Sequence, residues 1–497
     1  MQTALERLHA MATRQPEATA LIAADRVSLG YRDLAGLVAA LAERLVAAGL
    51  RPGDRVALRA PGDAGYVVGL LAALHAGMVA VPLNPVLPIP DQHTRITATG
   101  ARVVLVTEPG ATGLSVPCWP VRPAPGAGTV ELEVTAAAPS TPAPDGLDAD
   151  DAMIMFTGGT TGPPKMVPWT RHNIAGAVDA VIDTYRLTPR DATVAAMPLF
   201  HGHGLIAALL ATLTSGGSVL LPAAGRFSAH TFADDLEAAG ATWFTAAPTI
   251  HRILLTHRIP WRRLRFIRSC SATLDPSTAQ ALHDASGAPV VSAFGMTEST
   301  HQATSMRLTD RDLTTPGLVG ASTGPQIRIL GEDRRPCPPD VVGEVALRGP
   351  TVVRGYLADP AATAATFADG WLHTGDLGSL SADGELTLVG RIKELIDRGG
   401  EKISPEHVEG VLAGHPAVAE VAVYGVADPI YGQRVGAAVV AAAAAAPTPT
   451  ELAGFCRGRL APFEIPDDIH LTTGLPHTAK GSVDRRAVAE LFGRGSR

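Results

Sequence analysis

Cysteine is scarce in this sequence, with four residues in 497 and no Cys-x-x-Cys spacing among them. The four are Cys118, Cys270, Cys337 and Cys456. A chain of this length with so few scattered thiols is not a disulfide scaffold, and their spacing does not fit a structural zinc site. We therefore expect a protein of the reducing cytoplasm.

Blocks of basic residues and long apolar runs are also missing. The net charge of -7 is spread along the chain, so we expect neither nucleic acid nor an anionic membrane as a partner. Residues 1–18 carry charges where a signal peptide needs an apolar stretch. The most apolar segment, residues 66–83, contains Gly69 and His75 and ends against prolines. It predicts a buried helix and strand rather than a membrane span.

What the chain does have is a sustained alternation of helical and strand-like segments. Its 497 residues are too many for one core, and 46% apolar with 18% charged residues is a globular composition. Periodicity predicts helices over residues 31–48 and 63–75. Short apolar runs predict strands over residues 54–58, 79–83, 102–106, 217–221, 243–245 and 289–292. Such alternation predicts an α/β protein whose parallel sheets are covered by helices.

Three places interrupt this pattern. Residues 122–148 are rich in Pro, Ala and Gly, and we interpret them as a surface connection or an irregular edge element. Residues 441–450 are low in complexity and predict a helix end or a loop. After residue 390 the chain changes to a compact αβ pattern. We therefore place a boundary at residues 390–393, which gives domains over residues 1–390 and 391–497.

The strongest chemical signal is the loop Thr157-Gly158-Gly159-Thr160-Thr161-Gly162-Pro163-Pro164-Lys165. Its glycines let the backbone turn sharply and bring N–H groups close to a ligand. Its hydroxyls and its lysine add donors and one positive charge, which suits a polyphosphate. Two prolines before the lysine distinguish it from the Gly-x-x-x-x-Gly-Lys-[Ser/Thr] loop. Taken alone, the segment is also compatible with a mobile Gly-rich turn.

This loop resembles the Thr-Ser-Gly-Thr-Thr-Gly-x-Pro-Lys-Gly signature of the adenylate-forming superfamily, which includes acyl-CoA synthetases, luciferases and peptide-synthetase adenylation domains. The chain departs from it at Gly158 and Met166. Because residue 158 has no hydroxyl, we expect the loss of about one hydrogen bond to a phosphate, worth roughly 1 kcal/mol. The resemblance implies a large N-terminal domain of parallel-rich sheets flanked by helices plus a β-subdomain, and a small mobile α+β C-terminal domain. The resemblance also implies which residues bind the phosphates of ATP, namely Thr157, Gly158, Gly159, Thr160, Thr161, Gly162 and Lys165.

A second motif resembles the family's Tyr-Gly-x-Thr-Glu segment, with Phe294 in place of the usual tyrosine. The resemblance implies that Thr297 contacts the α-phosphate and that Glu298 holds Mg²⁺, since a carboxylate beside a phosphate needs a bridging cation. Taken alone, Thr297-Glu298 is more typical of a helix start. The resemblance also implies that the ATP/AMP-binding site includes Ser271, Ala272, Ser292, Ala293, Phe294 and Gly295.

A third motif, Trp371-Leu-His-Thr-Gly-Asp376, resembles the segment whose aspartate binds both ribose hydroxyls. A carboxylate can accept two such hydrogen bonds, although a Gly-Asp pair taken alone is typical of a turn. Arg391 matches the second ribose contact. Lys393 matches the hinge on which the family's small domain rotates.

Three segments look like the oxalate–CoA ligase group of acyl-CoA synthetases, namely residues 197–204, 266–272 and 394–405. In that group serine and histidine side chains lie near the substrate carboxylate. A polar pocket suits a small polar acid better than a fatty chain. Oxalate or another dicarboxylate is therefore the expected substrate class, with an aromatic or short aliphatic acid left open. The implied acyl pocket consists of His201, Ser269, Ser271 and His301.

Residues 197–204 contain His201 and His203, which form a His-x-His pair. Such a pair is compatible with metal binding. Because it lies in a Gly-rich turn without nearby carboxylates, we do not assign a metal to it.

The main departure from the family lies near the C-terminus. The family's catalytic lysine stands in Pro-x-Thr-x-x-Gly-Lys, whereas this chain has Ser482 there and Lys480 two residues earlier. Residues two apart in an extended chain point to the same side, about 6.6 Å along the strand. One hypothesis is that Lys480 substitutes as the catalytic cation on the α-phosphate. The other is a solvated Lys480 and a slow adenylation step.

Together the motifs predict a carboxylic acid–CoA ligase that uses ATP, Mg²⁺ and coenzyme A and forms an acyl-AMP intermediate with release of pyrophosphate. Rotation about Lys393 would then present a CoA face to the same cleft. The predicted catalytic residues are Lys480, Thr297, Glu298 and His201. The CoA face consists of Gly399, Gly400, Glu401 and Lys402.

Two alternatives remain open at this point. A related ligase would hand the adenylate to a carrier protein or an amine instead of CoA. A non-catalytic nucleotide-binding homologue is the alternative from another class, motivated by Gly158 and Ser482.

Overall fold

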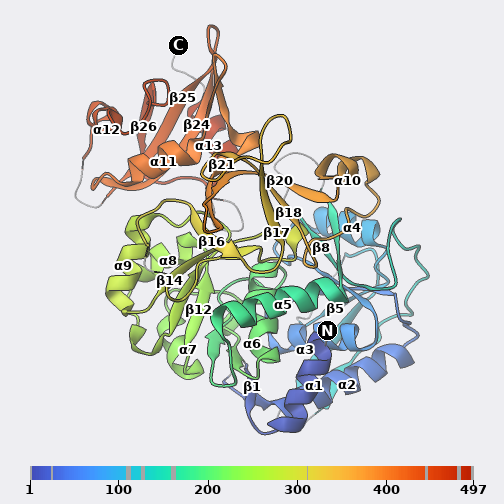
Figure 1. The fold of residues 1–497 in the computed structure, drawn as a ribbon. Coiled ribbons are helices and arrows are strands. Elements are labelled where there is room, and N and C mark those ends of the chain that lie inside the picture. The colour runs from blue at the N-terminus through green and yellow to red at the C-terminus, as the bar shows by residue number, and fades with distance from the viewer. Residues whose placement is uncertain are drawn as a thin grey trace.

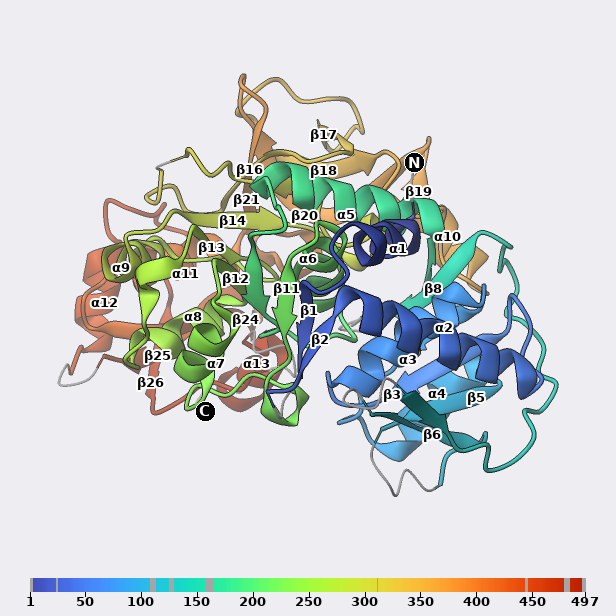
Figure 2. The same ribbon diagram turned by 90° about the horizontal axis from the view of Figure 1, so that it is seen from below.

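The computed structural model describes residues 3–23, 26–107, 113–124, 129–157, 164–310, 312–442, 446–477 and 483–493. Within these residues the strands form four sheets whose faces are covered by helices (Figures 1 and 2). A large N-terminal part, blue to yellow in Figure 1, is followed by a smaller orange-to-red part that lies against one side of it. The α/β architecture with a large N-terminal and a small C-terminal domain is confirmed.

The first large sheet has the strand order β7-β6-β5-β3-β4-β8-β9 in the described chain. From β6 to β8 the neighbours run parallel, and β4 and β5 are buried over their whole length, as expected for strands covered on both faces. Its strands are β3 (Arg55–Arg59), β4 (Val79–Pro82), β5 (Val103–Val106), β6 (Cys118–Ala124), β7 (Thr129–Leu132), β8 (Asp151–Phe156) and β9 (Met166–Thr170).

Helices α2 (Tyr31–Ala47), α3 (Ala64–His75) and α4 (Ile89–Thr99) accompany this sheet, as the blue elements of Figure 2 show. Asp63 caps α3, accepting a hydrogen bond from the Tyr66 N–H at 2.8 Å. Helix α3 is buried along most of its length and continues into buried β4, which confirms the prediction for residues 66–83. No helix among the described residues is long and apolar enough to cross a bilayer.

A smaller sheet has the order β10-β11-β1-β2 in the described chain. The π-helical segment η2 (His203–Leu210) is wholly buried and continues into α6 (Ala211–Thr214). The strands and remaining helices of this part are β1 (Thr19–Ile22), β2 (Ser28–Gly30), β10 (Ala192–Val194), β11 (Ser218–Leu220), α1 (Ala4–Arg14), α5 (Arg171–Tyr185) and η3 (Ala223–Gly225).

The third sheet changes character along its order β12-β13-β14-β15-β16-β21-β20-β18-β17. Strands β12 to β14 are parallel, whereas every pair from β14 onward is antiparallel. The sheet therefore joins a helix-covered half to the β-subdomain. Its strands are β12 (Trp243–Ala246), β13 (Phe266–Ser269), β14 (Val290–Phe294), β15 (Thr304–Ser305), β16 (Leu318–Ser322), β17 (Gln326–Leu330), β18 (Gly343–Arg348), β19 (Phe367–Ala368), β20 (Trp371–Leu380) and β21 (Glu385–Arg391).

Short helical segments lie along this third sheet. They include the parts of the chain that carry the second motif and the expected hinge. Their bounds are α7 (Phe232–Ala239), α8 (Pro248–Leu255), η4 (Trp261–Arg263), α9 (Pro276–Ser286), η5 (Thr297–Ser299), α10 (Pro360–Thr366) and η6 (Ile392–Glu394).

The C-terminal part has its own sheet, of order β23-β22-β25-β24 with β26 beside β25. Its apolar core includes Ile403, Val408, Val423 and Leu452. The chain passes into this sheet from β21 through η6. The elements are β22 (Ile396–Arg398), β23 (Glu401–Ile403), β24 (Val418–Asp428), β25 (Gly432–Ala441), β26 (Asp468–Thr472), α11 (Pro405–Ala413), α12 (Pro449–Cys456) and α13 (Arg485–Phe492).

Residues 122–148 are more ordered than a plain surface connection. Strands β6 and β7 pair antiparallel at the edge of the first sheet, and their Val121 and Val130 are buried. The edge-element interpretation was therefore the better one for the first half of this segment. The prediction failed to see the pairing because the prolines of β6 mask its alternation. Pro120 and Pro123 each lie where β6 pairs with a strand on one side only, which tolerates proline.

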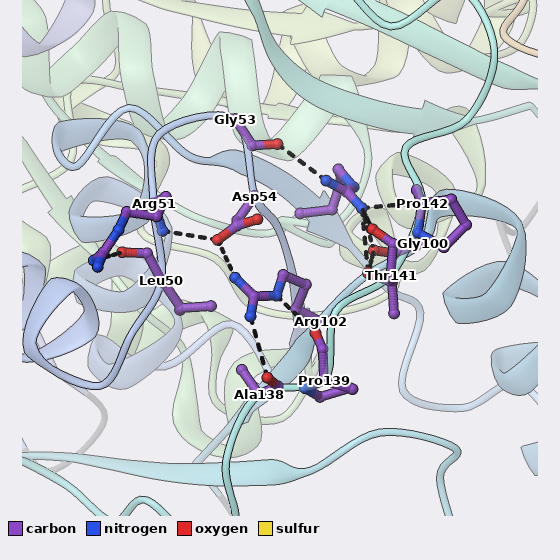
Figure 3. Close-up of polar contacts among 11 residues, drawn as sticks. Leu50, Arg51, Gly53, Asp54, Gly100, Arg102, Ala138, Pro139, Thr141 and Pro142 are labelled. Carbon is purple, nitrogen blue, oxygen red and sulfur yellow. Dashed lines mark hydrogen bonds and ion pairs between the residues drawn. The ribbon is translucent and has the colours of Figure 1, made fainter.

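The second half of that segment, residues 136–142, is held by arginine side chains (Figure 3). The nearly buried Arg55 donates hydrogen bonds to the carbonyl oxygens of Gly100, Thr141 and Pro142 at 2.8, 2.9 and 3.0 Å. Arg102 donates to the carbonyl oxygen of Pro139 at 2.7 Å. These contacts fasten an irregular chain to the ends of β3 and β5.

We predict that Arg55→Met destabilises the protein by roughly 2–4 kcal/mol, because the carbonyl oxygens of Gly100, Thr141 and Pro142 lose a donor whose side chain is buried. The measurement is the urea or thermal unfolding midpoint. Arg122→Met is the matched control, since that arginine is 48% exposed and pairs with Glu133, which is exposed as well. Its effect should stay below about 0.5 kcal/mol. Equal shifts in the two variants would contradict the role given to Arg55.

Candidate active site

The turn that carries the second motif is fixed by two large aromatic side chains. Trp169 on β9 donates its indole N–H to the carbonyl oxygen of Thr297 at 2.8 Å. The Tyr356 hydroxyl donates to Glu298 Oε1 at 2.8 Å. The phenol takes one acceptor position of the carboxylate and leaves the others for a ligand. Glu298 is therefore a mostly buried but oriented acceptor.

Lys165 lies on the same side of the molecule. Its ammonium group stands 4.3 Å from the centre of the Tyr356 ring, a cation–π distance. Burial raises the pKa of Tyr356, and the neighbouring Glu298 carboxylate raises it further, so the hydroxyl stays a donor. The Thr157 N–H donates to the Lys165 carbonyl oxygen at 3.2 Å, which closes the base of the predicted phosphate loop between β8 and β9. Residues 158–162 of that loop lie outside the described residues.

One carboxylate oxygen of Asp376 accepts no hydrogen bond within the described chain. Its Oδ1 pairs with Arg391 Nε at 2.8 Å, across the β20–β21 register. Its Oδ2 is buried and has no hydrogen-bond partner in the described chain. Burial raises the pKa of this carboxyl, and the Arg391 guanidinium opposes that rise. Buried acceptors are almost always satisfied, so the orphan oxygen fits a ligand hydroxyl such as that of a ribose.

The predicted adenine segment forms the end of β14. Phe294 packs its ring into the core of the β-subdomain rather than into open space, and Ala293 is also buried. A Cβ at Gly295 would stand 1.4 Å from the carbonyl oxygen of His301, so the backbone of this segment and that of His301 touch. Ser292 is half-buried. The close approach permits only glycine at residue 295.

On the acid side, the structure gathers His203, Ser271 and His301. His203 Nδ1 lies 2.9 Å from Ser271 Oγ, and the His203 and His301 rings stack with centroids 5.4 Å apart. Ser271 and His301 both have positive φ, +78° and +87°, an unfavourable backbone for side chains other than glycine. Strain of this kind clusters at ligand sites.

Two of the predicted acyl-pocket residues are placed differently. His201 packs against Phe200, with ring centroids 4.6 Å apart, and it is His203 that reaches Ser271. Ser269 is buried at the end of β13, and its hydroxyl has no partner in the described chain. Ala272 is exposed directly after Ser271, beyond the end of β13. Sequence analysis mentioned His203 only as part of a His-x-His pair and did not include it in the acyl pocket.

Arg268 on β13 was missed altogether. Its side chain is 0% exposed, and its guanidinium donates to Tyr185 Oη at 2.9 Å, Thr245 Oγ1 at 2.9 Å and Gln302 Oε1 at 2.9 Å. A fourth contact joins Arg268 Nη2 to His301 Nε2 at 3.1 Å. None of these partners is a carboxylate. The available signal was one arginine inside an otherwise apolar strand, which sequence analysis did not use.

Burial and this charge together set the state of the histidines. Burial lowers the pKa of His203 and of His301 well below its usual range, and the Arg268 guanidinium lowers both further. Both rings are therefore neutral near pH 7. This cluster thus combines neutral imidazole and hydroxyl groups with a buried cation.

The expected hinge and CoA face lie at the entry to the C-terminal sheet. Lys393 is exposed within η6. Gly399 and Gly400 form the tight β22–β23 turn with φ of +63° and +98°. Glu401 and Lys402 are exposed, and Lys402 pairs with Asp397. Lys480 and Ser482 lie outside the described residues.

Comparisons with known proteins agree on one family. The AMP-binding enzyme family matches residues 8–357, and the AMP-binding enzyme C-terminal domain matches residues 407–482. The chain is 39% identical to the oxalate–CoA ligase of Arabidopsis thaliana over 98% of both proteins. It is 35% identical to the sulfoacetate–CoA ligase of Cupriavidus necator, covering 92% of this chain and 91% of that one.

A solved structure gives the same result for the fold. The crystal structure of ATP-bound MatB from Rhodopseudomonas palustris matches 99% of both chains with a TM-score of 0.87 at 28% identity. Because the family and its full-length relatives cover nearly the whole sequence, the chain belongs to the AMP-binding enzyme family and is an ATP-dependent acid–CoA ligase.

Proposed function

We propose that this ligase acts on a small acid with a second anionic group, such as oxalate, and converts it to the CoA thioester through an acyl-adenylate. The observation that carries the proposal is the polar cluster of His203, Ser271 and His301 beside the cation of Arg268, which has no carboxylate partner among the described residues. Such groups need polar partners, and a buried charge needs a counter-ion. An acid with two anionic groups supplies both.

The relatives support the same choice. Oxalate and sulfoacetate, the acids named for two of them, each carry a carboxylate and a second anionic group. A long apolar acid would leave the pocket's donors unpaired at a cost of about 1–3 kcal/mol for each buried group.

In the first half-reaction an oxygen of the substrate carboxylate attacks the α-phosphorus of ATP, and the bond to pyrophosphate breaks. The protein needs no covalent nucleophile, since it works by alignment and charge compensation. Asp376 Oδ2 would accept a ribose hydroxyl, and Lys165 with the 157–162 loop would hold the phosphates. Glu298 would hold Mg²⁺, which when bound neutralises phosphate charge.

In the second half-reaction the CoA sulfur attacks the carbonyl carbon of the anhydride. The C–O bond to AMP breaks, and the thiol proton leaves to solvent. Rotation of the small domain about Lys393 would bring the Gly399–Lys402 turn to the cleft for this step, as in other domain-gated enzymes. The positive φ angles of both glycines suit a turn that must approach a ligand closely.

For the missing lysine at residue 482 we propose that Lys480 supplies the α-phosphate cation from its shifted position. The chain has four lysines, of which Lys165, Lys393 and Lys402 already have other assigned places. A flexible four-carbon stem lets the ammonium group reach from a displaced root.

Lys480→Ala should lower ATP–pyrophosphate exchange by about 100-fold, the usual loss for one transition-state donor. Ser482→Lys in that background should restore part of the exchange. The matched control is Arg486→Ala, because Arg486 is 73% exposed and pairs with Glu490 on the same helix. An unchanged exchange rate in Lys480→Ala would leave the solvated-lysine alternative standing.

Asp376→Asn should weaken AMP binding by about 10–100-fold, since the amide keeps the shape but loses the charge-assisted acceptors. Burial raises the pKa of Asp376, so AMP affinity of the unchanged protein should fall as the pH drops through that raised value. The Asn variant should lose this acid-side decline. Titration calorimetry measures both effects, with exposed Asp333→Asn as the control. Unchanged AMP affinity in Asp376→Asn would remove the ribose assignment.

A panel of acids tests the function itself. Thioester formation should favour oxalate and malonate over acetate, butyrate and benzoate by about 100-fold or more in kcat/KM. The same panel with a carrier protein or hydroxylamine in place of CoA tests the acceptor. Preference for a monoanionic or aromatic acid would contradict the substrate class. Absence of pyrophosphate exchange with every acid would indicate a non-catalytic homologue.

A further inference from the structure

Arg268 is an unusual residue to find in the middle of a parallel strand pair. It is fully buried on β13, between Thr245 on β12 and the His301 segment after β14. Its Nε donates to Tyr185, which also contacts Ser305 at 2.7 Å. Its Nη2 donates to Gln302 as well as meeting His301. A guanidinium with this many fixed partners has one orientation.

The contact with His301 determines where that imidazole carries its proton. Arginine has only donors, so the His301 Nε2 atom at 3.1 Å must accept. A neutral ring that accepts at Nε2 carries its hydrogen on Nδ1. Within the described chain that Nδ1 has no hydrogen-bond partner, which leaves it as a donor for a ligand.

A second path runs from the same guanidinium through Thr245. The Thr245 hydroxyl accepts from Arg268 Nη1 at 2.9 Å and lies 2.6 Å from His203 Nε2. A hydroxyl polarised by a charged donor is itself a better donor, so Thr245 donates to His203 Nε2. His203 then donates from Nδ1 to Ser271 Oγ at 2.9 Å. The exposed Ser271 hydroxyl keeps its own hydrogen for a ligand.

Among the described residues, the other titratable groups around the two histidines add no negative charge. They come from the turn before η2, from α5, from α8 and from the residue after β13. His251 lies on α8, and its Nε2 is 3.2 Å from the Arg268 carbonyl oxygen. Burial lowers the pKa of this histidine to about 4. The remaining ones are His201, Tyr185 and Cys270. No carboxylate is among them.

We propose that Arg268 is a positioning residue for substrate selection. It directs two hydrogen-bond relays, one through His301 and one through Thr245 and His203, that end in donors for the substrate's second anionic group. A carboxylate or sulfonate oxygen only accepts hydrogen bonds, so a receptor with every outward group donating fits it. This inference rests on the proposed function, since it concerns the acid that the ligase activates.

The test compares Arg268→Met with the unchanged protein over a pH series, with oxalate varied at saturating MgATP and CoA. The unchanged protein should show a KM for oxalate that is flat between about pH 6 and pH 8, because both rings stay neutral there. Without the guanidinium, burial still keeps both rings neutral, but nothing then determines which ring nitrogen carries the proton. The KM for oxalate should then be at least about tenfold above that of the unchanged protein at every pH in this range, because the donors toward the substrate are lost in part of the molecules. The KM for MgATP should stay within about threefold.

Arg265→Met is the matched control. Arg265 precedes the same strand but pairs with a carboxylate, Asp191, away from the histidines. Its loss should leave the KM for oxalate unchanged. A flat, unchanged KM in Arg268→Met would overturn the proposal, and so would an equal, pH-independent rise in KM for oxalate and acetate.

Two further variants keep the test decisive if Arg268→Met does not fold. Thr245→Val cuts only the second relay and should raise the KM for oxalate by about tenfold while the profile stays flat. Arg268→Lys keeps the charge and should keep the profile flat with an intermediate KM. An unchanged KM for oxalate in both would overturn the proposal. If the unchanged protein activates no doubly anionic acid, the proposed function fails; if it does and only the variants disagree, this inference fails alone.

Discussion

The predicted acyl pocket depends on a positive charge that the fold buries with no carboxylate beside it among the described residues. Arg268 reaches Tyr185, Thr245, His301 and Gln302, all of them uncharged. Removing a charge from water is expensive unless an opposite charge returns part of the cost. Burial and this charge together keep His203 and His301 neutral. The proposed preference for a doubly anionic acid rests on the same charge.

At the predicted nucleotide site the buried charged groups are negative instead of positive. Asp376 and Glu298 are carboxylates in buried positions, each with one side-chain partner among the described residues and acceptor capacity left over there. The third sheet holds both sides together, because it changes from parallel to antiparallel pairing after β14. Gly295 and His301 touch at that change, so the predicted adenine segment and the predicted acyl pocket share one piece of backbone.

Sequence analysis located the residues whose chemistry demands a fixed type at a fixed spacing. Thr297, Glu298 and Asp376 belong to contiguous motifs, and the alternation of helices and strands was enough for the fold class. Arg268 could not be found in this way, because its partners Thr245 and His301 are 23 and 33 residues away and only the sheet brings them together. Tyr356 was missed for the same reason, since it lies 58 residues from Glu298.

Other differences arise from local geometry that a pattern does not specify. His201 and His203 are two residues apart in one turn, and the π-helical start of η2 is what buries His203 beside Ser271. The β6–β7 hairpin was hidden by prolines, yet burial of Val121 and Val130 determines its pairing.

The most direct measurement follows one oxygen atom. With oxalate labelled with ¹⁸O in its carboxylates, MgATP and CoA, the AMP released should carry a single labelled oxygen, because a carboxylate oxygen becomes part of the α-phosphate. Mass spectrometry of the AMP reads this out. Unlabelled AMP, or label found in pyrophosphate or inorganic phosphate instead, would contradict an acyl-adenylate on a doubly anionic acid.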